Sequence, residues 1–470
     1  MSARRPPSPN PDRPILYWQA ALACFVIAAL AGALFRFGLV AGGLPFELTF
    51  DNVRRAHSHL MFFSWVTPAL MALMVVRLDR HLAIASDRAG SGRASSGQTG
   101  FGRPMYAVLA VNIVLGLASF VPFLLDGYGT TSVFGVSMPL TIILSTLSIF
   151  AWYAFAWLYW RKRRTLERTT SLALWDLAVV ALVISSLGTW VRGAQMGMGV
   201  EDPFWTNGSV HFFLGLFSDG WLAVGAMGLV WDHLKPSGGG AAFEGARRWL
   251  TALIVVGLPL TFVLGMPSRI VPADLWALAG VAGLIAGAGF VGHAVLLWRS
   301  AREREAGLWK LAIGALGLKG LAQMLFIVAP LAVWAEGAGL RLMYLHLLFL
   351  GFVTLVLLES ARLSLRNIRV QHLRLMQASV VVLLVAMLPT TGLWPASLIG
   401  KPSLWLTAVG SLVPVGAAIW ILFASSQGIN RARPAGSKTR RPPVDGRSDG
   451  APPHPAAPRP AGPTVVDDPR

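Results

Sequence analysis

Twelve long stretches of predominantly apolar residues follow one another along the chain, and they limit the folds that it can adopt. A helix needs about 20 such residues to cross the hydrocarbon core of a bilayer. Charged residues make up only 13% of the 470 residues, against roughly a quarter in soluble domains. We therefore predict an all-α fold, a polytopic membrane helix bundle of about 12 transmembrane helices. The predicted spans are about 15–40, 57–77, 105–126, 132–160, 171–197, 209–232, 248–268, 274–298, 307–334, 341–361, 373–394 and 402–424.

Basic residues concentrate in alternate connecting segments of this predicted bundle. By the positive-inside rule we expect a multi-pass protein of a bacterial-type inner (plasma) membrane, with both termini in the cytoplasm. The pattern accounts for the net charge of +18, so we expect the lipid bilayer and no nucleic acid as a partner. The basic segments are the N-terminus, 77–103, 161–164, 235–248, 299–304, 362–374 and the C-terminal tail. The segments between them contain Asp51, Asp126, Glu201, Asp202, Asp274 and Glu336.

The composition divides the chain into three regions. Residues 1–14 are a basic cytoplasmic N-terminus, residues 15–424 are the twelve-helix membrane domain, and residues 425–470 are a Pro/Arg-rich cytoplasmic tail that we expect to be disordered. Residues 84–103 are rich in Gly, Ser and Arg and are expected to form a flexible cytoplasmic loop. The one cysteine, Cys24, excludes a disulfide framework, and no Cys-x-x-Cys-His motif is present for a covalently attached c-type heme.

Three histidines lie near the outer ends of three predicted spans: His57, His211 and His346. Measured from the start of each span, their positions differ by about five residues, or roughly 7 Å along a helix. A histidine inside a membrane span is costly and needs a partner or a function. A shared metal or heme is one explanation. The alternative is that each histidine is solvated near the interface or bonded to a backbone carbonyl.

A fourth histidine, His59, follows His57 by two positions, which is about 200° around a helix. The two side chains cannot point into one site, so at most one of them is an axial ligand. We expect the other to face a second pocket or the interface.

The residues around the three outer histidines form short stretches with a recognisable pattern. They read Val53-Arg-Arg-Ala-His57-Ser-His-Leu-Met-Phe-Phe, Trp205-Thr-Asn-Gly-Ser-Val-His211-Phe-Phe-Leu and Tyr344-Leu-His346-Leu-Leu-Phe-Leu-Gly351. They resemble the ligand-bearing segments of subunit I of the heme-copper oxidase superfamily, and are nearest to the C-type oxidases and nitric oxide reductases. The resemblance covers residues 15–424. It implies that His57 and His346 ligate a low-spin heme and that His211 takes the place of one copper ligand.

The chain departs from the family at the binuclear centre. Tyr344 stands where the family has the histidine of the high-spin heme, and residues 251–263 lack the paired copper-binding histidines. A single imidazole binds copper weakly, so copper is not expected. The resemblance thus implies one low-spin heme b held by His57 and His346. A second heme ligated by Tyr344 as tyrosinate stays open.

Three roles remain open for His211. It could be a residual metal ligand, a residue distal to a bound gas, or a polar group that caps a cavity. We favour the last of these, because the sequence supplies no second copper ligand beside it.

Three further residues are candidates for contact with the heme. Arg54 and Arg55 precede His57, where guanidinium groups could pair with the propionates. The alternative is that they are ordinary interfacial arginines. Gly351 follows His346 by about one turn, where a missing side chain would let a flat ring approach the backbone.

Three ionisable residues, Asp219, Lys319 and Glu359, lie within predicted spans. Charges at that depth are expensive and often belong to proton or ion relays. Asp219 lies about two turns beyond His211 and could belong to a polar path. Lys319 and Glu359 could pair with each other, or the Glu359 side chain could extend to the cytoplasmic face.

These features favour a heme b-binding membrane protein for electron transfer or O2/NO handling, with its copper site lost. Whether it is an enzyme stays open, because the ligands of the binuclear centre are missing. If electrons flow through the protein, we expect a cytochrome or oxidase-type partner subunit, because the sequence shows no soluble domain for electron entry. The alternatives are a twelve-helix secondary transporter, in which intramembrane charges couple substrate or protons, and a heme-free accessory membrane subunit.

Overall fold

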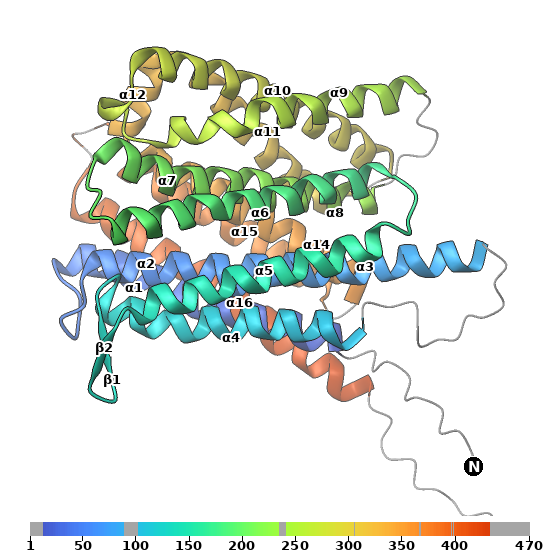
Figure 1. The fold of residues 1–470 in the computed structure, drawn as a ribbon, viewed down its shortest axis with the longest axis horizontal. Helices are drawn as coiled ribbons and strands as arrows, with labels where there is room; N and C mark the ends of the chain where they lie inside the picture. Colours follow the sequence, from blue (N-terminus) through green and yellow to red (C-terminus); the bar gives the residue numbers. More distant parts are fainter. Residues whose placement is uncertain are drawn as a thin grey trace, which may run out of the picture. The chain divides into compact units, whose positions relative to one another are not determined.

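The computed structural model describes residues 13–88, 102–234, 241–304, 306–365, 368–395, 397 and 399–432. In this part of the chain 11 helices are long and apolar enough to cross a membrane, or 12 if a bent pair of helices counts as one span. Figure 1 shows these helices side by side in one bundle. The prediction of an all-α polytopic membrane bundle is therefore confirmed.

Within the described residues, the bundle is built from sixteen α-helices interrupted by short 3-10 and π segments. The first half contains α1 (Arg13–Ala41), α2 (Phe50–Leu60), η1 (Met61–Val66), α3 (Thr67–Arg88), α4 (Gly102–Asp126), α5 (Leu140–Arg163), α6 (Thr170–Gly197), α7 (Pro203–Gly215), η2 (Leu216–Ala223) and α8 (Val224–His233). The second half contains α9 (Ala241–Gly257), η3 (Leu258–Gly265), η4 (Ser268–Ile270), α10 (Ala273–Glu303), η5 (Gly307–Trp309), α11 (Lys310–Leu325), α12 (Ala329–Gly337), α13 (Leu340–His346), η6 (Leu347–Thr354), α14 (Leu355–Leu365), α15 (Val370–Met387), η7 (Leu388–Thr390) and α16 (Lys401–Ala432).

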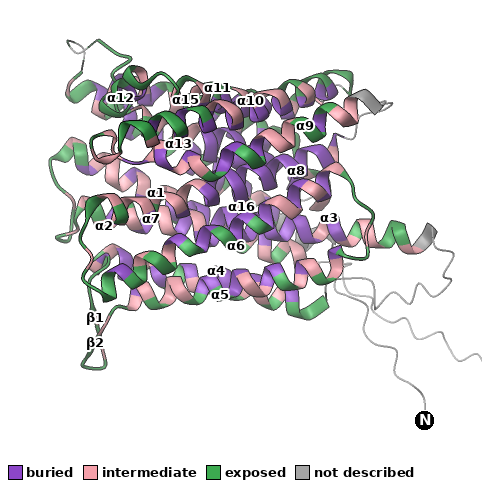
Figure 2. Ribbon diagram, turned by 45° about the horizontal axis from the view of Figure 1, so that its top comes forward, coloured by how far each residue is buried: buried purple, intermediate pink, exposed green. Residues whose placement is uncertain are grey.

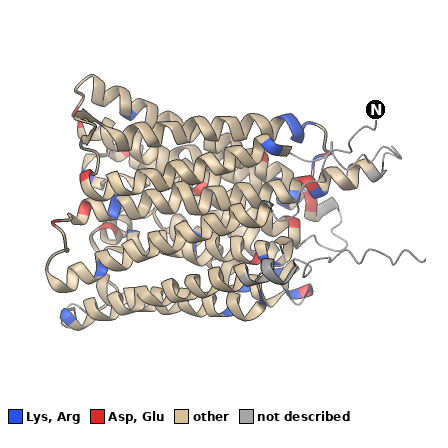
Figure 3. Ribbon diagram, turned by 90° about the horizontal axis from the view of Figure 1, so that it is seen from below, with Lys and Arg blue, Asp and Glu red and all other residues tan. Residues whose placement is uncertain are grey.

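The charged residues lie mainly at the two ends of the bundle, with few between them (Figure 3). We call the end that holds Arg161–Arg164 and the start of α1 the basic end. The opposite end holds His57, His211 and His346, and we call it the histidine end. This separation follows from the cost of placing unpaired charges in hydrocarbon.

The predicted ninth span, 307–334, is not one straight helix. Its two parts, Gly307–Leu325 and Ala329–Gly337, are bent by 117° at the break. Pro330 lies in the first turn of α12, where its missing N–H removes no helical hydrogen bond. The same residue could not continue the hydrogen bonds of α11, so the chain turns before it.

A short hairpin, which the sequence did not indicate, precedes α5 at the histidine end. Strands β1 (Thr131–Val133) and β2 (Val136–Met138) pair antiparallel, with Ser132 opposite Ser137. Phe134 and Gly135 connect the strands, with a φ of 50° at Phe134 and of 81° at Gly135. Two successive positive φ values are typical of a type I′ hairpin turn. The helix predicted from residue 132 therefore begins at Leu140.

The core of the bundle is formed by the spans that carry the three histidines. In the spans Phe50–Ser86 and Pro203–His233, 83% of the most apolar window is buried, and in Leu340–Leu365 it is 67%. The corresponding shares for Pro14–Ala41 and Phe243–Gly265 are 33% and 28%. Buried residues accordingly gather on the inner helices, and exposed ones lie on the outer helices and at the ends (Figure 2). The histidine spans are thus surrounded by protein, and the outer spans face the apolar surroundings.

The predicted flanking regions lie largely outside the described residues. Of the predicted N-terminus 1–14, only residues 13 and 14 are described, and they begin α1. The predicted loop 84–103 is helical in part, because α3 runs to Arg88, and residues 89–101 lie outside the described part. Of the predicted tail 425–470, residues up to 432 continue α16 and the others lie outside it.

Candidate functional site

The three histidines of the histidine end lie at nearly the same distance from the start of their helices. His57 is the eighth residue of α2, His211 the ninth residue of α7 and His346 the seventh residue of α13. Helix α2 begins earlier than the predicted span, because Thr49 caps it by accepting a hydrogen bond from the N–H of Asn52. The differences amount to about 3 Å along a helix.

Each of these helices changes to a π-helix just after its histidine. The π segments are η1, which follows His57 by four residues, η2, which follows His211 by five, and η6, which follows His346 directly. Such segments are rare and are frequent at functional sites. Three of them at one level of the bundle mark this region as a candidate site.

The His57 side chain is fixed against α1. Its Nδ1 lies 2.7 Å from the backbone oxygen of Ala28, and no described residue forms a hydrogen bond with its Nε2. A carbonyl can only accept, so Nδ1 carries the proton and Nε2 keeps its lone pair. This is the form of imidazole that binds a metal through Nε2.

His346 is held in the same way. Its Nδ1 lies 2.8 Å from the backbone oxygen of Leu342, one turn earlier in α13, and no described residue forms a hydrogen bond with Nε2. Both rings are half-buried. Electrostatic interaction reaches from His57 to His346, and from Arg36 of α1 to both rings. Both imidazoles lie at the histidine end of the bundle, and each has a nitrogen free to bind iron.

Arg36 of α1 is a cation whose charge acts on both imidazoles, and its position in the sequence gave no sign of this role. Its side chain is half-buried, and it forms no ion pair with any described Asp or Glu. A carboxylate from a ligand would compensate such a charge.

The structure gives Arg54 and Arg55 other partners. Arg54 lies 2.9 Å from Asp51 with most of its side chain exposed. Arg55 lies 3.6 Å from the same carboxylate, and its guanidinium is over the ring of Tyr128 at 5.1 Å. The two arginines thus interact with their own helix and with the loop after α4.

His59 faces away from His57, as the helical spacing predicts. Its ring stacks on Phe123 of α4 with a centroid distance of 3.8 Å, and on Phe63 at 5.1 Å. Its Nε2 lies 3.2 Å from the Tyr128 hydroxyl. His59 thus contacts α4 and the loop that follows it, whereas His57 contacts α1. The two histidines therefore lie in different environments.

His211 has a cation beside it. One terminal nitrogen of Arg341 lies 3.3 Å from its Nδ1 and 3.5 Å from its Nε2. Gly265 leaves room for this pair, since a Cβ there would lie 3.0 Å from Nδ1 of His211 and 3.2 Å from Arg341. A guanidinium at this distance disfavours a second cation on the same ring. The contact fits the interpretation of His211 as a polar group at a cavity better than that of a metal ligand.

Tyr344 and Gly351 lie on the same span as His346. Tyr344 precedes His346 by two positions, about 200° around the helix, and lies within electrostatic reach of Asp219. A Cβ on Gly351 would lie 3.3 Å from Cβ of Ala315 in α11. The missing side chain at Gly351 therefore makes room for α11 and not for a ring at His346. The glycine that makes room for a histidine is Gly32, because a Cβ at that position would lie 2.9 Å from Cε1 of the His57 ring.

Aromatic rings join the three π segments below the histidines. Phe62 of η1 lies 5.0 Å from Phe349 of η6 and 5.8 Å from Phe217 of η2, between ring centroids. The indole N–H of Trp65 donates to the Thr354 hydroxyl at 3.3 Å. This layer would exclude water from a flat group held between the histidines, and it would fix the three spans to one another.

The intramembrane charges pair differently from the prediction. Lys319 donates to Asp219 of η2 at 2.8 Å and to Gln323 at 2.5 Å, and its Nζ lies 3.7 Å from the centroid of the Phe290 ring. Glu359 instead accepts two hydrogen bonds from Arg362, both of 2.6 Å. The Lys319–Glu359 pair, one of the two alternatives predicted for these residues, is therefore wrong. Helix packing brings Asp219 to Lys319 across 100 positions of sequence, which spacing alone does not reveal.

Within the described ranges, no group of three or more His, Cys, Asp or Glu side chains is arranged to hold a metal ion. Two imidazoles suffice for a heme, because the porphyrin supplies the four other nitrogen ligands. The residues present fit such a group: two imidazoles on different spans, each with Nε2 free, a nearby cation without an acidic partner among the described residues, and an aromatic layer. No family model matches the chain, and no curated protein matches it.

Proposed function

We propose that this protein is a membrane hemoprotein that holds one low-spin heme b between His57 and His346. The observation that carries the proposal is the shared state of the two rings: each Nδ1 is bonded to a backbone carbonyl, and neither Nε2 has a partner among the described residues. When bound, a bis-imidazole heme supplies one-electron redox chemistry.

The chain's own residues have distinct tasks in this proposal. Ala28 and Leu342 hold the protons of the two rings on Nδ1, which keeps each Nε2 unprotonated and oriented. Gly32 lets the His57 ring lie against α1, and Arg36 supplies a positive charge for a propionate. Phe62 and Phe349 keep water from the site.

Electron transfer is the activity that this arrangement favours over gas binding. If His57 and His346 both held the iron, they would leave no open coordination position, and a bound gas needs such a position. Any electron donor and acceptor would be other proteins or quinones at the membrane, and a cytochrome or oxidase-type subunit remains our proposed partner. We further propose that the histidine end faces the outside of a bacterial-type plasma membrane, with both termini in the cytoplasm.

The experiment is an absorbance spectrum of the purified protein, reduced minus oxidised, with heme extracted and counted per chain. We expect a b-type α band, about one heme per chain, and no change on adding carbon monoxide to the reduced protein. A carbon monoxide shift would support gas handling instead. A colourless, well-folded protein would contradict heme binding.

A secondary transporter is the second candidate, and the Asp219–Lys319 pair together with the bent α11–α12 span favours it. Transporters place ionisable groups and broken helices near their substrate sites. The spectrum separates the two candidates, because a transporter needs no heme.

A further inference from the structure

A pocket of about 270 Å³ lies at the basic end of the bundle, on the side opposite to the histidine site. It is formed where the end of α8, the connection from α10 to α11, and the end of α14 meet. The described side chains that define its chemistry are His233, Arg304, Trp309, Glu359 and Arg362.

Glu359 fixes the orientation of the Arg362 guanidinium and leaves some of its N–H groups available to a ligand. Its Nε and one terminal nitrogen each donate to a carboxylate oxygen at 2.6 Å, and Glu359 is almost fully buried. The second terminal nitrogen forms no hydrogen bond with a described residue. The forked pair therefore fixes the guanidinium plane and leaves donors for a further acceptor.

His233 brings a polar atom without a partner to the same pocket. Its Nε2 is buried and has no hydrogen-bond partner among the described residues. The ring lies 5.7 Å from the ring of Trp309, tilted by 34°. Because an unpaired polar atom in a buried position costs free energy, an acceptor in the pocket would stabilise this arrangement.

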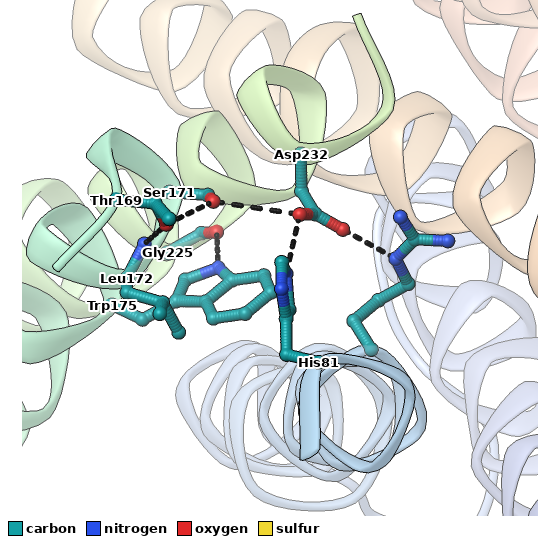
Figure 4. Close-up of polar contacts among 8 residues, drawn as sticks. His81, Thr169, Ser171, Leu172, Trp175, Gly225 and Asp232 are labelled. Carbon is teal, nitrogen blue, oxygen red and sulfur yellow. Dashed lines mark hydrogen bonds and ion pairs between the residues drawn. The ribbon is translucent and has the colours of Figure 1, made fainter. Parts of the chain in front are cut away.

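The charges around the pocket favour an anion. Arg304 adds a second guanidinium to the wall, and Glu359, the acidic residue among the described lining residues, is paired with Arg362. Asp232, next to His233, is likewise occupied: it accepts from His81 at 2.7 Å and from Ser171 at 3.4 Å (Figure 4), and it pairs with Arg77. The positive charges of Arg77, Arg80 and Arg362 act electrostatically on His233, and the negative charge of Asp232 opposes them.

We propose that this pocket binds a phosphate group, with Arg362 and Arg304 as its charged ligands and His233 as a neutral donor. Guanidinium groups match the geometry of phosphate oxygens, and Trp309 offers an apolar surface for the attached carbon chain. The volume is near the lower limit of small-molecule sites, so it suits a phosphate with a small substituent. A phospholipid headgroup and a soluble phosphate ester share this chemistry, and basic pockets between span ends are a known place for anionic lipids.

The test uses the full-length protein and a readout that contains no heme signal. Thermal unfolding is followed in detergent with glycerol 3-phosphate or inorganic phosphate, and in nanodiscs of phosphatidylcholine with or without phosphatidylglycerol. We expect saturable stabilisation by the soluble phosphates, by phosphatidylglycerol, or by both, and the responding arm identifies the source. Stabilisation by none of them would overturn the proposal.

Two variants keep the Arg362–Glu359 pair intact and locate the site. Arg304→Gln and His233→Phe should each weaken the binding at least about tenfold, while Arg302→Gln removes an equal charge from the same end of α10 outside the pocket lining. We expect Arg302→Gln to bind as the unaltered protein does. Equal weakening by Arg302→Gln and Arg304→Gln would show a diffuse surface effect and would contradict a defined phosphate site.

Discussion

Gly32 and His57 lie against each other across the contact between α1 and α2, with no space for a side chain between them. A Cβ on residue 32 would lie 2.9 Å from Cε1 and 3.0 Å from Nδ1 of the ring. The glycine therefore sets the position of the histidine that we propose as an axial ligand. It also keeps Ala28 within hydrogen-bond distance of Nδ1.

The first prediction concerns this contact. Gly32→Ala should move the His57 ring and lower the heme content per chain, and Gly32→Val should lower it further. The reason is that added atoms in a close-packed protein interior force neighbouring side chains out of their positions. Heme per chain is measured after purification under equal conditions. Gly416→Ala is the matched control, since a Cβ at that position of α16 meets no atom within 4 Å. Full heme content in Gly32→Val would contradict the proposed position of the ring.

The second prediction concerns Arg36. A positive charge near the iron disfavours the oxidised form, so removing it should lower the midpoint potential. For Arg36→Gln we expect a decrease on the order of 50 mV, measured by redox titration of the α band. Arg54→Gln is the control, because Arg54 is largely exposed and paired with Asp51. Equal changes in the two variants would rule out a special role for Arg36.

The third prediction concerns the buried Asp219–Lys319 pair. Lys319→Met leaves a buried carboxylate without its cation and should destabilise the fold by about 3–5 kcal/mol. The double variant Asp219→Leu/Lys319→Met should recover part of this loss, because both charges are then gone. Denaturant unfolding in mixed micelles gives the coupling between the two sites. Additive effects of the single substitutions would mean that the pair is not an interacting unit.

The fourth prediction concerns the orientation of the bundle. In a Cys24→Ser background, Ser132→Cys places a thiol in the exposed hairpin at the histidine end, and Thr165→Cys places one at the basic end. A membrane-impermeant thiol reagent should label residue 132 on intact cells, and residue 165 only after the membrane is opened. The reverse pattern would contradict the proposed orientation.

The spans and the separation of His57 from His59 could be predicted, because both depend on local periodicity. Apolar length alone defines a span, and a two-residue spacing alone sets opposite faces of a helix. The break at Pro330 shows the limit of this reasoning: a proline near the end of an apolar stretch was not enough to divide the predicted span 307–334, although it turns the chain by 117°.

The partners of the charged residues could not be predicted, because they depend on which helices pack together. Asp219 meets Lys319 from 100 residues away, and the charge of Arg36 acts on His57 across the contact between α1 and α2. The π segments had no signal in the sequence either. Arg54 and Arg55 were chosen for their closeness to His57 along the chain, but the helix directs them toward Asp51 and Tyr128.

The central claim is that His57 and His346 are the two axial ligands of one heme, and one comparison tests it most directly. Heme per chain and the b-type α band are measured for the unaltered protein and for His57→Ala, His346→Ala and His59→Ala. We predict that the first two substitutions abolish the band and that His59→Ala keeps it, because His59 lies between Phe63 and Phe123 on the other face of α2. A full band in either His57→Ala or His346→Ala would contradict the account.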